Sequence, residues 1–183
     1  MKVLLVTNKV KTYALGFQNI LNPMLSLGHE VVWAADFSKF NGDKSIIPCK
    51  TFQICIDSNP AKPCNYVAFK EICRIIKEEN IEAIQCNTPI GGLLGRLAGK
   101  NQRVPLVIYA AHGFLFFKGA PLINRTVYKW EEMWLARYTA AIITINKEDF
   151  EASKKLKLRN NGKRFMIHGA GIESGKIINA NRV

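Results

Sequence analysis

The sequence predicts a doubly wound α/β domain in which helices cover both faces of a parallel sheet. Short runs rich in leucine and β-branched residues alternate with segments of helical spacing from one end of the chain to the other. Runs that are apolar on both faces are typical of central parallel strands. Such an alternation implies crossover connections and a covered parallel sheet. The 183 residues contain no linker, low-complexity tract or repeat, which indicates one domain.

The apolar runs predict about seven strands. The first, "KVLLVT", has no polar face and therefore predicts a central strand. The remaining runs are bounded by polar or glycine-containing segments, as strands are. The expected strands cover residues 2–7, 29–35, 51–56, 81–87, 105–112, 140–146 and 164–172.

The segments between the strands have helical spacing and recognisable ends. Gly28 is expected just beyond the end of the first helix, where glycine adopts the left-handed conformation. Thr88 and Pro89 have the residue types of an N-cap and a first helical position. The last segment has acids in its first turn and lysines in its last, which matches the helix dipole. The expected helices cover residues 17–28, 66–80, 88–101, 122–138 and 147–158.

The charge is unusual for a small globular domain. The 26 Lys and Arg residues against 14 Asp and Glu give a net charge of +12 and a pI of about 9.6. Such a surface attracts nucleic acid, anionic lipid headgroups or phosphate-bearing substrates. The longest apolar runs fall short of the roughly 20 residues that span a bilayer. The amino terminus is typical of a first strand and not of a signal peptide, so we expect a cytoplasmic protein.

The five cysteines have no metal-ligand or CxxC spacing. In a reducing compartment they are expected to be free thiols with packing or surface roles. They lie at Cys49, Cys55, Cys64, Cys73 and Cys86.

Polar residues follow most of the predicted strands. Ligands of such sheets bind outside the carboxyl ends of the strands, so these positions are the candidate site. The loop after the first strand contains Gly16 as its single glycine, and no GxGxxG or Walker pattern follows. This argues against NAD or ATP phosphates as the ligand. The polar set consists of Thr7, Asn8, Asp36, Asn87, Thr88, His112, Gly113, Asn146, His168 and Gly169.

Several motifs resemble a known family. "HGFLFFKGAP", "EMWLARYTAAIITINKEDFEAS" and "IHGAGIE" occur in this order, preceded by "MKVLLVTN", "LSLGHEV" and "NTPIGGLLGRLA". This ordered set resembles the amino-terminal half of family 4 glycosyltransferases of the GT-B fold. The branch is the one that builds capsular, exopolysaccharide or O-antigen chains in bacteria.

The resemblance implies one half of a two-domain, retaining enzyme. Residues 1–172 would form a Rossmann-like, acceptor-side domain, and residues 173–183 would begin an interdomain linker. The nucleotide-sugar domain would lie outside this sequence, so we expect this chain to be inactive alone. The expected partners are a nucleotide-sugar and a saccharide on polyprenyl diphosphate, with no nucleic acid, metal or other cofactor. Two alternatives stay open: a non-catalytic membrane-docking subunit and one half of a nucleotide-sugar epimerase.

The resemblance places His112 near the reaction centre. At the end of a central strand and before Gly113, its imidazole is expected to position a substrate and not to act as a general base. Gly16 would allow close approach to a phosphate or acceptor, or simply begin a helix. Thr88, Gly91 and Gly92 would offer free N–H groups to an acceptor phosphate, or serve tight packing. Lys118 completes the expected cleft.

Aromatic and basic residues near the histidine predict a membrane contact. This mixture is typical of an interfacial surface, and lipid-linked acceptors lie at the bilayer. We therefore expect a peripheral position on the inner face of the plasma membrane. The alternative is that the tryptophans pack in the core and that the basic residues are merely solvated. The expected contact residues are Phe114, Phe116, Phe117, Arg125, Lys129, Trp130 and Trp134.

Overall fold

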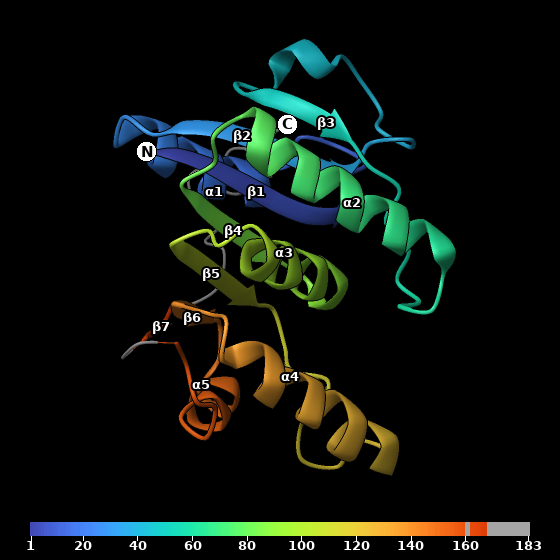
Figure 1. The fold of residues 1–183 in the computed structure, drawn as a ribbon, viewed down its shortest axis with the longest axis vertical. Helices are drawn as coiled ribbons and strands as arrows, with labels where there is room; N and C mark the ends of the chain where they lie inside the picture. The colour runs from blue at the N-terminus through green and yellow to red at the C-terminus, as the bar shows by residue number, and fades with distance from the viewer. Residues whose placement is uncertain (160–161, 168–183) are drawn as a thin grey trace, which may run out of the picture.

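A computed structural model describes residues 1–159 and 162–167 of the chain. In this part the strands form one seven-stranded sheet with the order β3-β2-β1-β4-β5-β6-β7 (Figure 1). Every neighbouring pair is parallel, which confirms the predicted sheet. The strands are β1 (Lys2–Lys9), β2 (Glu30–Asp36), β3 (Lys50–Gln53), β4 (Ala83–Asn87), β5 (Leu106–Ala111), β6 (Ala141–Thr144) and β7 (Lys163–Met166).

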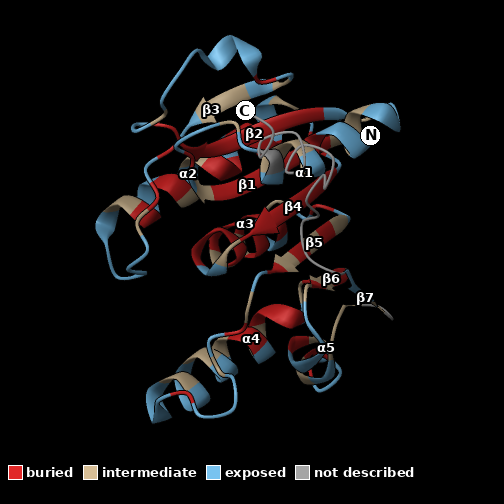
Figure 2. Ribbon diagram, turned by 180° about the vertical axis from the view of Figure 1, so that it is seen from behind, coloured by how far each residue is buried: buried red, intermediate tan, exposed pale blue. Residues whose placement is uncertain are grey.

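Helices cover both faces of the sheet, as predicted. Leu21 of α1 packs with Leu5 and Trp33 on one face. On the other face, α2 to α5 pack on a larger cluster that includes Leu4 and Ile84. Figure 2 shows the central strands as predominantly buried. The α-helices are α1 (Leu15–Ser26), α2 (Pro63–Glu78), α3 (Pro89–Asn101), α4 (Lys129–Ala136) and α5 (Lys147–Ser153), with a 3₁₀ turn η1 (Lys44–Ile46) and a π-helix η2 (Asn124–Tyr128).

The strand order reverses between β1 and β4. The chain runs outward from β1 through β2 to β3, and then returns to place β4 on the other side of β1. The connection after β1 runs towards β2, and the connection after β4 runs the other way, towards β5. The two connections therefore separate and leave a crevice at the carboxyl ends of β1 and β4. In open α/β sheets this crevice is where ligands bind.

The predicted helix boundaries at Gly28 and Thr88 are confirmed. Gly28 has φ +74°, and its N–H donates to Leu25 O while His29 N–H donates to Met24 O. These two bonds form a Schellman motif, which satisfies carbonyls that the helix end would otherwise leave free. Thr88 is the N-cap of α3 and Pro89 its first residue.

Four predicted elements differ clearly from the structure. The strand expected over 51–56 is β3 (Lys50–Gln53), which ends three residues earlier. The expected helix 122–138 begins as the π-helix η2, where the Thr126 hydroxyl donates to Leu122 O, and becomes α4 only at Lys129. Such bonding from a threonine to the preceding turn bends helices. Helix α5 ends at Ser153, before the predicted 158, and the Ser153 carbonyl there accepts from the Leu156 N–H and from the Arg164 guanidinium of β7. The predicted seventh strand extended to 172, but β7 ends at Met166; His168 and the linker 173–183 lie outside the described residues.

Candidate functional site

A cavity of about 450 Å³ opens at the crevice between β1 and β4. Its wall is formed by the ends of β1, β4, β5 and β6 and by the first turns of α1. Most of the wall is apolar and includes Phe17 and Ile20 on α1 and Ile143 in β6. The polar side chains lie among these apolar groups, which is the usual composition of a small-molecule site.

Some of the polar set makes local hydrogen bonds and does not line this cavity. The Asp36 carboxylate accepts hydrogen bonds from Ser38 N–H and Gln53 Nε2, both at 3.0 Å. The Asn146 side chain accepts from Asp149 N–H at 2.8 Å and caps α5. These two residues are therefore explained by turn and helix-end geometry. Five members of the set line the cavity, namely Thr7, Asn8, Asn87, Thr88 and His112. Of these, the Thr7 hydroxyl accepts a hydrogen bond from Trp33 Nε1 at 2.9 Å.

Two asparagine oxygens in the cavity wall are buried without a hydrogen-bond donor. Among the described residues, Asn8 Oδ1 and Asn87 Oδ1 are fully covered and have no partner. The Asn87 residue is only 3% exposed. A buried polar atom with no partner costs about 1–3 kcal/mol, so native proteins rarely leave one without a reason. Because both oxygens are covered, a ligand with hydroxyl or N–H donors can reach them only after the covering groups or the amides themselves rotate.

Thr88 is held in an uncommon backbone conformation beside Asn87. Its φ is +67°, and a β-branched residue at positive φ is strained. The Thr88 hydroxyl accepts from Gly91 N–H at 3.4 Å, and its carbonyl accepts from Gly92 N–H at 2.8 Å. Strain of this kind is concentrated at functional sites, because a tight turn there directs neighbouring groups towards the ligand.

His112 lies at the end of β5 and reaches solvent at the cavity. Partial burial against the wall lowers the pKa of His112 below its usual value of about 6.5, because burial disfavours the imidazolium. The imidazole is therefore neutral at pH 7 and can donate one hydrogen bond and accept another. The next residue, Gly113, has φ +132°, a conformation that side chains rarely allow.

The loop after His112 is anchored on the first turn of α5. Asp149 is 4% exposed, and its Oδ1 accepts the Phe114 N–H at 3.1 Å. Glu148 Oε1 accepts the Lys118 N–H at 3.0 Å. This role of Asp149 was missed from the sequence. The available signal was an acid three residues after a capping asparagine, a position where a carboxylate faces free N–H groups.

The other predicted cleft residues divide into two groups. Gly16 lines the cavity with Thr88 and His112. Gly91 and Gly92 are buried in the first turn of α3 and do not line it. A Cβ atom on Gly92 would lie 2.4 Å from the Tyr109 ring, so this glycine permits close packing of α3 on β5. Packing was the alternative that the sequence left open for this pair.

Gly113 and Lys118 also lie away from the main cavity. Gly113 lines a separate crevice of about 60 Å³ with Ser58, Tyr109 and Phe114. Lys118 is exposed and lines neither space. Their connection to the cavity is through the backbone of the loop that follows His112.

The predicted membrane-contact residues are only partly on the surface. Phe114 is 4% exposed and belongs to the core, which removes it from any exposed surface. Phe116 is half-buried and stacks on Phe114 with ring centroids 4.9 Å apart. Trp134 is half-buried and packs edge-to-face on Tyr138 at 5.5 Å. The aromatic anchors of this region therefore face the protein, because their rings complete the packing of the loop and of α4.

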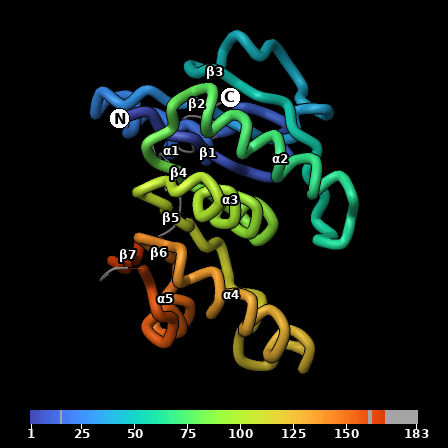
Figure 3. The backbone as a smooth tube through the Cα atoms, in the orientation of Figure 1, coloured from blue at the N-terminus to red at the C-terminus, as the bar shows by residue number. Residues whose placement is uncertain are grey.

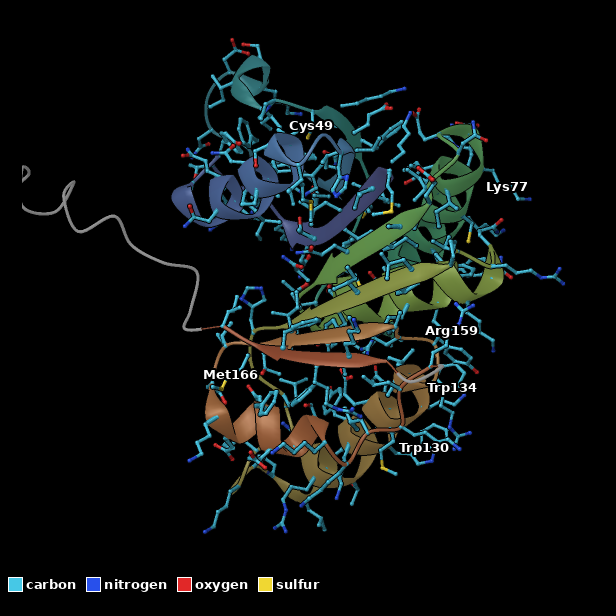
Figure 4. The ribbon with its side chains drawn as sticks, turned by 90° about the vertical axis from the view of Figure 1, so that its left-hand side faces the viewer. Cys49, Lys77, Trp130, Trp134, Arg159 and Met166 are labelled. Atoms are coloured by element: carbon cyan, nitrogen blue, oxygen red, sulfur yellow. The ribbon has the colours of Figure 1, made fainter. Side chains whose placement is uncertain are left out.

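The remaining predicted residues lie on an exposed surface that we call the apolar–basic face. Phe117 is 50% exposed and Trp130 is 68% exposed, and Arg125 and Lys129 are exposed as well. Figure 4 shows Trp130 and Trp134 on the same helix. No helix within the described ranges has the length and apolar character needed to cross a bilayer. The face also includes exposed residues that the sequence analysis did not select, namely Leu122, Ile123, Val127 and Met133.

A buried ion pair joins α3 to the helix of this face. Arg96 is fully buried, and its guanidinium contacts both Glu132 oxygens at 2.7 and 2.9 Å. The same guanidinium lies 4.0 Å from the centroid of the Tyr109 ring. This bidentate geometry fixes how α4 sits on α3. Nothing in the sequence spacing indicated it, since 36 residues separate the two charges.

The comparisons with known proteins agree with this geometry. A family model described as glycosyl transferase 4-like matches residues 2–146. A Bacillus subtilis (strain 168) protein named "Putative glycosyltransferase EpsD" is 39% identical over 125 residues, which cover 67% of this chain and 32% of that protein. An Escherichia coli UDP-Gal:alpha-D-GlcNAc-diphosphoundecaprenol alpha-1,3-galactosyltransferase is 32% identical over 78 residues, which cover 43% of this chain and 20% of that enzyme. The matched part therefore spans about a third or less of these relatives.

Solved structures share the fold at low sequence identity. UDP-N-acetylglucosamine 2-epimerase from Rickettsia bellii has a TM-score of 0.68 at 10% identity and covers 100% of this chain and 49% of its own. The lipopolysaccharide galactosyltransferase WaaB has a TM-score of 0.63 at 12% identity, with 89% and 44% covered. MurG from Acinetobacter baumannii has a TM-score of 0.57 at 12% identity, with 91% and 46% covered. These matches confirm the Rossmann-like fold of one half of a GT-B protein, and the chain belongs to the glycosyl transferase 4-like family.

Proposed function

We propose that this chain is the acceptor-side half of a glycosyltransferase of bacterial surface polysaccharide synthesis. The sugar would move from a nucleotide-sugar, bound mainly by a second domain, to a saccharide carried on a lipid diphosphate. The observation that supports this best is the cavity with two unsatisfied amide oxygens, Asn8 Oδ1 and Asn87 Oδ1, in an apolar wall. A sugar ring offers both hydroxyl donors and apolar C–H faces, and so matches this combination.

The residues around the cavity have distinct proposed roles. Asn8 and Asn87 accept hydrogen bonds from saccharide hydroxyls. The neutral imidazole of His112 holds a hydroxyl or carbonyl in a fixed orientation while charge develops at the reacting sugar carbon. The first turn of the 12-residue helix α1 has no side-chain cap, and its free N–H groups beside Gly16 would bind a diphosphate.

The apolar–basic face supports a lipid-linked acceptor. Its exposed Phe117 and Trp130 would enter the interface between headgroups and acyl chains, while Arg125 and Lys129 bind anionic headgroups. A net charge of +12 adds to this attraction. The E. coli relative is named for an acceptor on diphosphoundecaprenol, which is a membrane lipid. We therefore propose a peripheral position on the inner face of the plasma membrane.

A titration of the 183-residue chain tests the proposal. A short-chain prenyl diphosphate carrying N-acetylglucosamine should give saturable binding by calorimetry, and UDP alone should bind only weakly. The reason is that the saccharide uses the cavity of this half and the nucleotide uses the other. Micromolar UDP binding without any saccharide binding would contradict the acceptor-side role.

One half of a nucleotide-sugar epimerase is the second candidate. The R. bellii epimerase shares the fold with the TM-score of 0.68 given above. The apolar–basic face favours the transferase, because an enzyme acting on a soluble nucleotide-sugar has no use for a membrane surface. The third candidate is a docking subunit without a saccharide site. It predicts that the chain binds vesicles but gives no binding heat with the prenyl diphosphate saccharide.

A further inference from the structure

A groove of about 300 Å³ lies at the carboxyl ends of α3 and α4. The two helices contact each other on one face of the sheet (Figure 3). The chain passes from α3 into β5 and from α4 into β6, so the groove lies at the edge of the sheet where these strands begin. The cavity between β1 and β4 lies at the opposite edge. We call this second space the basic groove, and its wall consists of Gly99, Lys100, Arg103, Arg137, Tyr138 and Arg159.

Four of the six residues in this wall are cations, and none is an acid. Within residues 1–159 and 162–167, none of the four cations forms an ion pair with an acidic side chain. Cations gathered in a concave wall repel one another and attract anions from solution. The groove is therefore a candidate anion site.

Helix-end electrostatics explains only part of this cluster. Lys100 and Arg137 lie at the ends of α3 and α4, where a cation interacts favourably with the helix dipole. Arg159 belongs to neither helix. It is brought to the groove by tertiary contacts, since its N–H donates to Thr139 O at 3.0 Å and its Nη1 to Val104 O at 3.1 Å. The convergence of the cations is a property of the fold.

Arg103 occupies a position at which arginine is unfavourable. Its φ is +56°, its N–H donates to Lys100 O at 3.2 Å, and Val104 N–H donates to Gly99 O at 2.9 Å. These bonds form a Schellman motif, in which the left-handed residue is usually glycine or asparagine. The left-handed residues that follow α1 and α2 are Gly28 and Asn80, which are these usual types. Arginine at the end of α3 thus places a cation in the groove at the cost of backbone strain.

The aromatic part of the wall connects the groove to the apolar–basic face. Lys100 Nζ lies 4.4 Å from the centroid of the Tyr138 ring and 5.5 Å from that of Trp134. Trp130, Met133 and Arg137 follow one another at intervals of three and four, so they share one side of the helix. Figure 4 shows Arg159 on the same side of the molecule as Trp130 and Trp134. Exposed apolar groups and the cationic groove are therefore neighbours along α4.

We propose that the basic groove binds the phosphate group of an anionic membrane lipid and thereby orients the domain on the bilayer. Arginine guanidinium groups match phosphate oxygens with pairs of parallel hydrogen bonds, and Lys100 adds a compact charge. A lipid carries its phosphate next to its acyl chains, as the groove lies next to Trp130. The inference rests on the proposed peripheral position, but the affinity of the groove can be measured without a membrane.

The first experiment follows the arginine Nε–H signals by ¹H–¹⁵N NMR. The chain is titrated with dihexanoyl phosphatidylglycerol below the concentration at which this lipid forms micelles. The signals of Arg103, Arg137 and Arg159 should shift together and saturate, whereas that of Arg74, paired with Glu78 on α2, should not move. Equal shifts of Arg74, or no shift at the groove, would overturn the proposal. Inorganic phosphate is the second titrant, and binding as tight as that of the lipid would identify a site for a soluble anion instead.

The second experiment measures sedimentation with vesicles of equal parts phosphatidylcholine and phosphatidylglycerol. Arg103→Gly should lower vesicle affinity about fivefold, and Arg103→Gly with Arg137→Gln about 30-fold. The matched control Lys70→Gln with Lys77→Gln removes the same charge from α2 and should have a clearly smaller effect. Arg103→Gly should not lower the free energy of unfolding, because glycine is favoured at this φ.

The outcomes separate the groove from the peripheral position. If the double groove variant binds vesicles as tightly as the control, or if Arg103→Gly only destabilises the fold, the groove is not a lipid site and the peripheral position stands. If the native chain binds no vesicles although its arginine signals shift with the short-chain lipid, the peripheral position fails and the phosphate site stands.

Discussion

At the scale of single residues, Asn87 should lower the stability of the fold and raise the affinity for a saccharide. Its buried Oδ1 has no partner in the described chain, and such a group costs about 1–3 kcal/mol. Asn87→Leu replaces it with an apolar side chain of similar size. We expect the free energy of unfolding to stay equal or to rise by about 1 kcal/mol, and saccharide affinity to fall about tenfold or more. Urea unfolding and the calorimetric titration measure the two effects.

The control for this substitution is Asn22→Leu on the exposed side of α1. It should leave saccharide affinity unchanged. If Asn87→Leu loses stability by several kcal/mol, Asn87 is a structural residue and its oxygen is satisfied by ordered water.

His112 should give the transfer reaction a specific pH dependence. Because burial lowers its pKa below about 6.5, the imidazole is neutral at pH 7 and becomes charged only as the pH falls through that lowered value. Turnover should therefore be constant near neutrality and fall in acid. His112→Ala should lower kcat by about 10²-fold, the scale of one lost positioning contact. The measurement is the rate of sugar transfer between pH 5 and 8, with the His112 change made in an enzyme preparation that is active in transfer.

His112→Gln separates charge from hydrogen bonding. It keeps a donor and an acceptor but does not titrate, so it should retain part of the activity and lose the acidic decline that is due to the imidazole. If His112→Ala has normal turnover, His112 does not position a substrate and its role at the end of β5 is structural.

At the scale of elements, the Arg96–Glu132 pair should determine how α4 is held. Glu132→Gln leaves the fully buried Arg96 without its counter-charge, and breaking a buried pair costs about 3–5 kcal/mol. We expect a loss of this size in urea unfolding. The matched control Glu78→Gln breaks the exposed Arg74–Glu78 pair and should change stability by less than about 0.5 kcal/mol.

A double substitution tests whether the charge itself matters. Arg96→Met with Glu132→Leu removes both buried charges and should recover most of the stability that Glu132→Gln loses. Equal destabilisation by the single and double changes would mean that packing, and not the ion pair, holds α4 on α3.

At the scale of the whole molecule, the +12 charge and the apolar–basic face should together bind anionic membranes. The chain should sediment with vesicles that contain anionic lipid and much less with neutral ones, since each basic residue near the surface contributes about 1 kcal/mol. Salt should release it, because screening acts over about 10 Å at 0.1 M. Phe117→Ser with Trp130→Ser should weaken binding even at low salt, because apolar insertion is lost while the charge is kept.

Tyr66→Ser is the matched control for the membrane prediction. Tyr66 is 62% exposed on α2, away from the apolar–basic face, and its loss should not alter vesicle binding. If the chain does not bind anionic vesicles at low salt, the membrane prediction is wrong and the basic surface binds a soluble anionic ligand instead.

The sequence by itself determined the fold class, the order of strands and helices, and the edge of the sheet at which the cavity lies. These follow from local periods and from end signals such as Gly28 and Thr88, which depend only on neighbouring residues. Asn8 and Asn87 were also visible as polar residues after apolar strands, but their unsatisfied oxygens were not. Whether an oxygen is buried without a donor depends on groups from several strands and helices, and periodicity carries no such information.

Only the tertiary structure decided which side chains face inward. The aromatic run after His112 suggested a single surface, yet Phe114 is buried while Phe117 is exposed. The reason is that Asp149, 35 residues further along the chain, binds the Phe114 N–H and draws the start of this loop into the core. Contacts between residues so far apart in sequence, such as this one and Arg96–Glu132, exist only once the sheet brings their elements together.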